Sequence, residues 1–269
     1  MLFVALSSST AHGGGHVAQA LDAVSSPVAQ APDSLPWLPP MQTPTPAPPQ
    51  LPPTAFWIFA HPDDETLAAA AAMIQSQQAG VRNVVVIISS GEFTITRLRL
   101  GLTNAQVKVA RQAESAAALS IIGIKDVRYI GLPEGQVTPQ VLSDLIDSLL
   151  QEGGKDALFR GHSPYDAYAG LQCGHMDHCA IGRGLLAAWQ DGRVKNLVFY
   201  RLSHLFDGKR SATCLSLTPS EQATKRQMAD AYALYKPSIG RYGVAAQSVP
   251  GAWYKARTEP ECTDLPVAG

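Results

Sequence analysis

Long apolar runs are missing from this chain of 269 residues. No stretch approaches the roughly 20 apolar residues that a membrane-spanning helix needs, so we expect no membrane span. An excess of charge of one sign is also missing, because the formal net charge is −1. Binding to nucleic acid would require a basic surface, and we therefore expect no nucleic-acid partner.

Lysine and arginine are absent from residues 1–53, which are rich in Ala, Ser, Pro and Gly. The stretch PTPAPPQLPP at the end of this segment is typical of extended polyproline. We therefore expect residues 1–53 to be a disordered, proline-rich leader and residues 54–269 to form one domain. The start MLFVAL and the later AQA resemble part of a secretion signal, although the usual basic residues are missing. We expect a secreted protein, with a cytoplasmic one as the alternative.

Cysteine is scarce, and no CxxC pair occurs, which argues against a structural zinc knuckle. The four cysteines allow three fully paired connectivities, and the sequence does not choose among them. An even count after a signal-like start favours an oxidising compartment, and four buried thiols are the alternative. A bridge between Cys173 and Cys179 would brace the loop between them. The other two cysteines are Cys214 and Cys262.

From residue 55 onward, short apolar runs alternate with helical patterns. We expect strands at residues 55–60, 83–89, 127–130, 156–159 and 196–200. We expect helices at residues 65–78, 104–122, 139–151, 177–190 and 220–235. Residues 161–175 have the composition of a loop, and residues 236–269 show no clear period. This alternation predicts a single α/β domain with a Rossmann-like, mostly parallel sheet and helices on both faces.

Ionisable residues follow the first expected strand directly. The string AHPDDE places His61, Asp63 and Asp64 where ligands bind in open α/β sheets, beyond the carboxyl end of a strand. Proline and carboxylates are also common at a helix start, so each residue alone has a structural explanation. For Glu65 we expect that structural role.

A second cluster lies in the string CGHMDHC, which contains His175, Asp177 and His178. Residues three apart share a face at a helix start, so the two histidines are expected to lie together. His61 and Asp64 have the same spacing. Two such pairs above one sheet edge predict a metal site with mixed His and Asp ligands. Zinc favours this ligand set, and catalytic zinc sites have three protein ligands and one open coordination position.

AHPDDE together with the downstream HMDH resembles the PIG-L/LmbE family of zinc-dependent N-acetylglucosamine deacetylases. The turn SSGE, residues 89–92, and the stretch RQAESAAALSIIG, residues 111–123, add weaker matches. The resemblance covers roughly residues 55–205, the size of one domain. The family often has glycines after the acidic motif, where this chain has alanines at 68–72, so we expect different local packing.

The resemblance implies that His61, Asp64 and His178 hold Zn²⁺ and that Asp63 is the general base. The chemistry is consistent with these roles. Zinc lowers the pKa of its water toward ~7 and polarises the amide carbonyl. A carboxylate beside that water can take its proton and deliver it to the leaving amine.

The resemblance also implies roles for three further residues. His175 would face the oxyanion, with Asp177 orienting its ring. Arg111 would lie near the sugar hydroxyls of the substrate. An ion pair of Arg111 with Glu92 or Glu114 is the alternative.

The implied reaction is hydrolysis of the N-acetyl amide of an N-acetylglucosaminyl group on a small-molecule glycoside. One family branch acts on N-acetylglucosaminyl-inositol compounds, and another acts on glycopeptide antibiotic pseudoaglycones. We expect the glycopeptide branch, because a signal-like start and the apolar stretch ITRLRLGL suit a bulky aromatic substrate met outside the cell. Two functions without catalysis stay open, a zinc-dependent sugar-binding module and a structural metal site, and Asp63 and His175 argue against the first. The sequence says nothing of the oligomeric state.

Overall fold

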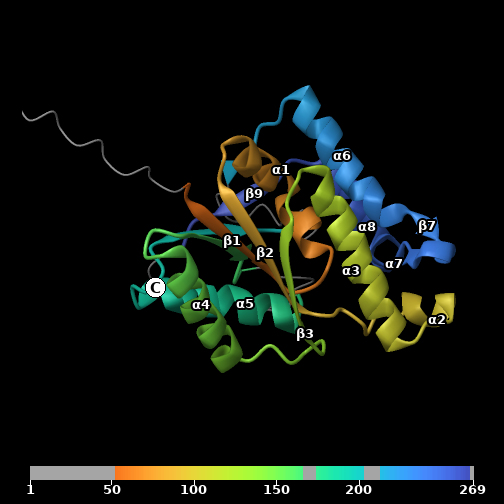
Figure 1. Cartoon of the computed structure of the whole chain (residues 1–269), viewed down its shortest axis with the longest axis horizontal. Helices are drawn as coiled ribbons and strands as arrows, with labels where there is room; N and C mark the ends of the chain where they lie inside the picture. Colours follow the sequence, from red (N-terminus) through yellow and green to blue (C-terminus); the bar gives the residue numbers. More distant parts are fainter. Residues whose placement is uncertain (1–51, 166–173, 203–212, 267–269) are drawn as a thin grey trace, which may run out of the picture. The chain divides into compact units, whose positions relative to one another are not determined.

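The structure is a computed structural model that describes residues 52–165, 174–202 and 213–266 (Figure 1). All of these residues belong to one unit, which extends from residue 50 to residue 269. Residues 1–51 of the expected leader and Cys173 lie outside the described residues. The leader and the bridge between Cys173 and Cys179 therefore stay predictions.

In the described part of the chain, the central sheet has seven strands in the order β3-β2-β1-β4-β5-β9-β6. Strands β1 to β5 are parallel, and β9 and β6 add an antiparallel edge. The bounds are β1 Thr54–Phe59, β2 Arg82–Ser89, β3 Asp126–Leu132, β4 Leu158–His162, β5 Asn196–Tyr200, β6 Thr213–Cys214 and β9 Cys262–Asp264. The short strands β7 Tyr235–Lys236 and β8 Arg241–Tyr242 pair with each other. The predicted mostly parallel α/β sheet is confirmed.

Helices cover both faces of the sheet, as the pattern predicted (Figure 1). Trp57 and Phe59 of β1 pack on one face, and the alternate residues Phe56 and Ile58 pack on the other. The first face is covered by α1 Asp64–Gln78, α3 Asn104–Ile121, α6 Pro219–Ala233, α7 Val244–Ser248 and α8 Pro250–Thr258. The second face is covered by α4 Pro139–Gly153 and α5 Met176–Gln190. The remaining short helices among the described residues are α2 Thr96–Leu100 and the 3₁₀ turn Pro237–Ile239.

Local sequence signals set where several helices begin. The Thr103 side chain accepts the backbone N–H of Gln106, and the Gln106 side chain accepts the N–H of Thr103. Thr218 and Glu221 form the same capping box at the start of α6. Among the described helices, none is long and apolar enough to cross a bilayer.

Helix α1 is interrupted at Ala69, whose φ of −140° and ψ of 15° are not helical. Just beyond the interruption, the backbone N–H groups of Ala71 and Ala72 donate to the Glu261 carboxylate at 2.7 and 3.2 Å. Glu261 thus satisfies two N–H groups that have lost helical partners. The interruption divides α1 into a first part, which carries Asp64, and a second part, whose first N–H groups bind Glu261.

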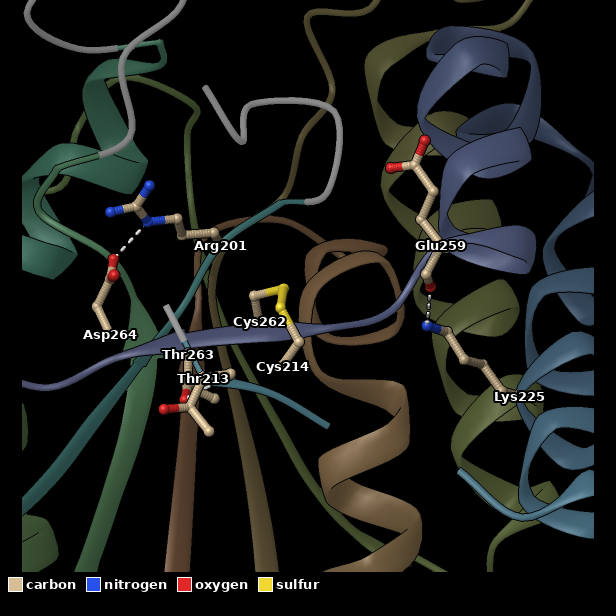
Figure 2. The surroundings of a disulfide bond; sticks show 8 residues. All are labelled: Arg201, Thr213, Cys214, Lys225, Glu259, Cys262, Thr263 and Asp264. Atoms are coloured by element: carbon tan, nitrogen blue, oxygen red, sulfur yellow. Dashed lines mark hydrogen bonds and ion pairs between the residues drawn. A yellow bond between two sulfur atoms is a disulfide. The ribbon is translucent and has the colours of Figure 1, made fainter. Parts of the chain in front are cut away.

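A disulfide joins Cys214 of β6 to Cys262 of β9, which are direct partners in the antiparallel pairing (Figure 2). The sequence left this connectivity open. Strand β9 also carries Asp264, which pairs with Arg201 and accepts the Ser163 hydroxyl at 2.8 Å. The bridge therefore anchors strand β9. Glu261, just before this strand, contacts α1, and Asp264 within it contacts Ser163, which follows β4.

Candidate active site

A cavity of about 540 Å³ opens beyond the carboxyl end of β1. Strand β1 and its neighbour β4 lie at the point where the strand order reverses, which is where ligands bind in such sheets. Asp177 lies behind the cavity, against His61. The cavity lining includes the predicted residues His61, Asp63, Asp64, Arg111, His175 and His178.

Two imidazole nitrogens and one carboxylate oxygen form a small triangle in this cavity. His61 Nδ1 lies 3.2 Å from His178 Nε2 and 3.2 Å from Asp64 Oδ2, and the last two atoms are 3.1 Å apart. All three side chains are buried. A zinc ion at about 2.0–2.1 Å from each atom, in tetrahedral geometry, would hold such atoms roughly 3.3 Å apart. The triangle therefore fits the three-residue ligand set that the sequence predicted.

The electrostatics of the triangle suit a cation. Burial lowers the pKa of His178 to about 3, so its ring is neutral and its nitrogens are available as ligands. Burial raises the pKa of Asp64, but His178 and His162 outweigh it and hold that pKa well below its usual range. Burial also opposes protonation of His61, yet hydrogen bonds to Asp177 and Asp64 raise its pKa to about 10. A metal ion would displace that proton.

Asp63 is adjacent to Asp64 in the chain but has a different partner. Its Oδ2 lies 2.7 Å from Arg111 Nη2, and both side chains are buried. Burial raises the pKa of Asp63 to about 7, although the positive Arg111 opposes the shift. Arg111 also donates to the carbonyl oxygen of Gly91 at 2.7 Å. A Cβ at Gly91 would lie 2.4 Å from Arg111 Nη1, so only glycine allows this approach.

The ion pair gives Arg111 another partner than the two glutamates that the sequence suggested, and its predicted place near the substrate stays a prediction. Its guanidinium binds Asp63 rather than Glu92 or Glu114, although it still lines the cavity. Glu114 instead accepts the backbone N–H groups of Val244 and Ala245 at 2.9 and 3.1 Å. That contact fixes the start of α7 against α3, which brings residues 248–252 to the cavity wall.

His175 occupies the position before the first turn of α5. Its Nδ1 accepts the backbone N–H of Asp177 at 3.2 Å, which leaves the proton of a neutral ring on Nε2. That Nε2 lies 3.1 Å from Glu134 Oε1, and Glu134 also lines the cavity. The Asp177 carboxylate lies instead against His61 Nε2, at 3.4 Å, and accepts the Gly135 N–H at 2.9 Å. Asp177 contacts the His175 ring through its backbone N–H, and Glu134 contacts the other ring nitrogen. The orienting role of Asp177 stays a prediction.

The sequence interpretation missed His162. It was assigned to a loop, because Arg160 and Gly161 interrupt the apolar pattern, yet β4 continues through these residues. His162 is fully buried, and its Nε2 lies 3.2 Å from Asp64 Oδ2. The position of a histidine at the end of a strand that neighbours β1 was the signal that could have found it.

Glu65 has the structural role that the sequence predicted. Its Oε2 accepts the backbone N–H of Asp63 at 3.0 Å. Its Oε1 accepts the hydroxyls of Ser115, at 3.2 Å, and Tyr232. The carboxylate thus ties the turn before α1 to α3 and α6.

Apolar side chains form the outer wall of the cavity. Leu67, Ile95, Leu202, Val249 and Pro250 line it together with the polar residues. The wall joins two distant segments, because the Thr94 hydroxyl lies 2.7 Å from the Ser248 hydroxyl. Ile95 is 65% exposed and Val249 is 37% exposed, so both can contact a bound molecule.

Comparison with known proteins identifies the same region. The family model described as PIG-L: GlcNAc-PI de-N-acetylase matches residues 56–189. This range contains all seven predicted site residues and also His162. Helices α6 to α8 and strand β9, which complete the cavity wall and the supports of α1, follow the matched range.

Solved structures with the same fold catalyse different reactions. N,N'-diacetylchitobiose deacetylase from Pyrococcus horikoshii has a TM-score of 0.56 and 15% identity, covering 79% of this chain and 84% of that chain. The zinc-inhibited form of a teicoplanin deacetylase has a TM-score of 0.55 and 18% identity, covering 78% and 96%. A 4-carboxy-2-hydroxymuconate hydratase from Pseudomonas putida has a TM-score of 0.54 and 17% identity, covering 81% and 98%. At these identities the likeness shows the shared fold alone.

Proposed function

This chain belongs to the PIG-L family of deacetylases, and we propose that it hydrolyses the N-acetyl amide of an N-acetylglucosaminyl group with the help of a zinc ion. The observation that carries the proposal is the triangle of His61 Nδ1, Asp64 Oδ2 and His178 Nε2, with sides of 3.1 to 3.2 Å. These three residues would hold the zinc. When bound, zinc would lower the pKa of a water molecule toward ~7 and polarise the acyl carbonyl. Other divalent ions suit the same ligands.

Asp63 is the proposed general base. Its pKa of about 7 is close to neutral pH, which suits a group that first accepts and then donates a proton there. Asp63 takes a proton from the attacking water as the C–O bond forms. It delivers that proton to the amide nitrogen as the C–N bond breaks, so that acetate and a free amine leave. Arg111 keeps the carboxylate oriented and opposes its protonation.

His175 is the proposed oxyanion donor. Negative charge develops on the carbonyl oxygen during attack, and a donor fixed in advance stabilises it. The backbone N–H of Asp177 fixes the proton on Nε2, and Glu134 orients that nitrogen at the cavity edge. The positive end of α5 adds to the stabilisation.

We further propose that the substrate is a glycopeptide antibiotic pseudoaglycone. The apolar wall that Ile95, Val249 and Pro250 form beside the cavity supports this substrate class, because an aromatic aglycone would bury apolar surface there. An N-acetylglucosaminyl-inositol compound has hydroxyls at the same place and gains little from such a wall. The disulfide between Cys214 and Cys262 supports the related proposal that the protein works in an oxidising compartment.

The substrate proposal is tested by measuring amine release from both compound classes. We expect higher kcat/KM with the pseudoaglycone and a KM for it that rises about 10-fold or more in Val249→Asp. The matched control is Val109→Asp, an exposed valine of α3 away from the cavity lining, which should leave KM unchanged. Turnover of only the inositol compound would overturn the glycopeptide proposal and leave deacetylation intact.

The alternative to an enzyme is a non-catalytic sugar-binding module. It has no use for a carboxylate with a pKa near neutrality beside the proposed ligands, or for a histidine held in one tautomer. The hydratase with the same fold shows that fold alone does not decide the reaction. The assignment to deacetylation rests on the family match and on the site.

A further inference from the structure

His162 touches two of the three proposed zinc ligands. Its ring stacks on that of His178, with centroids 4.0 Å apart and planes 10° apart. Its Nε2 lies 3.2 Å from Asp64 Oδ2, the oxygen that belongs to the ligand triangle. The edge of Phe59 packs against the ring, and His162 has no exposed surface.

The hydrogen bonds around His162 decide where its proton lies. Nε2 is 3.2 Å from Asp64 Oδ2 and also 3.2 Å from the backbone nitrogen of Ala60. The first contact requires a proton on Nε2, and the second requires a lone pair there. A hydrogen bond to an ionised carboxylate is roughly twice as strong as a neutral one. Nδ1 has no hydrogen-bond partner among the described residues, so a proton there would be buried without an acceptor, whereas a proton on Nε2 takes the acceptor away from the Ala60 N–H. The charge of Asp64 decides between the two arrangements.

We therefore place the proton on Nε2, where it forms a hydrogen bond to Asp64 Oδ2. While Nε2 holds this proton, it is a hydrogen-bond donor to Asp64, and we therefore assign His162 to the support of the ligands rather than to a fourth ligand position. A fourth protein ligand would close the coordination shell, as in structural zinc sites, whereas catalytic sites keep one position open. Donation to Asp64 thus preserves the open position.

We propose that His162 is a positioning residue of the zinc site: it holds Asp64 by a hydrogen bond and His178 by ring stacking, in the geometry that binds the ion. This inference rests on the proposed function, because it requires that the triangle binds zinc. Partners of this kind orient metal ligands, and their loss typically weakens metal binding about 10- to 100-fold.

Zinc affinity measured by chelator competition tests the proposal without use of the enzymatic activity. His162→Phe keeps an aromatic ring against His178 and Phe59 but removes the proton donor, so we expect zinc to bind about 10- to 100-fold more weakly. His162→Gln places an amide N–H near the position of Nε2 and should recover most of the affinity. Ser163→Ala is the matched control, because Ser163 is adjacent but contacts Asp264 instead of the ligands. It should bind zinc as the wild type does.

Cobalt substitution separates a positioning residue from a ligand. The visible absorption of Co²⁺ reports the atoms bound to it, so cobalt-loaded wild type, His162→Phe and His162→Gln should give the same spectrum. A changed spectrum in either variant would make His162 a ligand and overturn the proposal. Should His162→Phe fail to fold, as thermal melting would reveal, the Gln variant alone still gives this answer.

The zinc affinities also test the positioning role of His162 separately from the proposed zinc-dependent function. Unchanged zinc affinity in His162→Phe, with tight binding by the wild type, would overturn the inference and leave the proposed function standing. A wild type that binds no zinc would overturn both.

Discussion

Arg111 and Asp63 form a buried ion pair, with Arg111 Nη2 2.7 Å from Asp63 Oδ2. The pair links α3 to the turn after β1. It gives the proposed base a fixed orientation toward the cavity. It also opposes the burial that raises the pKa of Asp63, so the carboxylate can serve as a base near neutral pH. Arg111, which we predicted from the sequence to lie near the substrate, thus contacts the proposed base directly.

Removing one partner of this pair should destabilise the protein strongly. Arg111→Met leaves a buried carboxylate without its counter-charge, and we expect the free energy of unfolding to fall by about 3–5 kcal/mol. The double variant with Asp63→Asn should be less destabilised than the sum of the two single variants. Chemical denaturation of all four proteins measures this coupling. Strictly additive effects would show that the two side chains do not interact.

Zinc should stabilise the folded protein in proportion to the logarithm of its concentration once the site is nearly saturated. Zinc at 100 times its dissociation constant adds about 2.7 kcal/mol to the free energy of unfolding. Thermal melting of chelated protein with and without added zinc measures the effect. Asp64→Asn serves as the control, because it replaces one of the three proposed zinc ligands and should reduce the stabilisation by zinc. An equal response in this variant would place the binding site elsewhere.

The disulfide should contribute to stability through the loop it closes. Its cysteines are 48 residues apart, and the chain-entropy model gives about 4 kcal/mol for such a loop. Figure 2 shows the bridge between Cys214 and Cys262, and Asp264 on the same strand as Cys262. Glu261 directly precedes Cys262 in the chain. We expect the double variant Cys214→Ser/Cys262→Ser to unfold at a lower temperature. A melting temperature equal to that of the wild type would contradict this role.

Acid should weaken an ion-pair network on the opposite edge of the sheet. Hydrogen bonds from Arg128 lower the pKa of Glu152 from 4.5 to about 2, with Arg82 adding to the effect. Because the folded pKa is the lower one, the stabilisation is present above about pH 4.5 and is lost as the pH falls toward 2.

Glu152→Gln should therefore reduce stability at pH 7 and have little effect at pH 2. The side chain is partly exposed, so the difference should not exceed about 1 kcal/mol. Unfolding free energies of both proteins at the two pH values measure it. A larger cost at pH 2 than at pH 7 would reverse the expected sign and refute the assignment.

The sequence predicted the sheet and most of its helices because the signals were local. Strand β2 is an uninterrupted apolar run, and α3 begins at a capping box, so both were recognisable without tertiary information. The same holds for the cluster of His61 with Asp64, where two ligands come from a single turn. Residues that depend on long-range contacts were harder to assign.

Three contacts illustrate what we did not predict from the sequence. His162 was missed because Arg160 and Gly161 hid the end of β4. The partner of Arg111 could not be chosen because Asp63 is 48 positions away in the chain. The segment after Tyr235 had no clear period, yet Glu261 caps the interrupted α1 from there. Each of these is decided by packing between distant segments.

The central claim is that Asp63 acts as the base beside a metal held by His61, Asp64 and His178. The most direct test is amine release from an N-acetylglucosaminyl substrate by the wild type and by Asp63→Asn, with bound zinc measured in both. We predict turnover by the wild type, a loss of about 100-fold or more in the variant, and equal zinc content. Undiminished turnover in Asp63→Asn with its zinc in place would contradict the account.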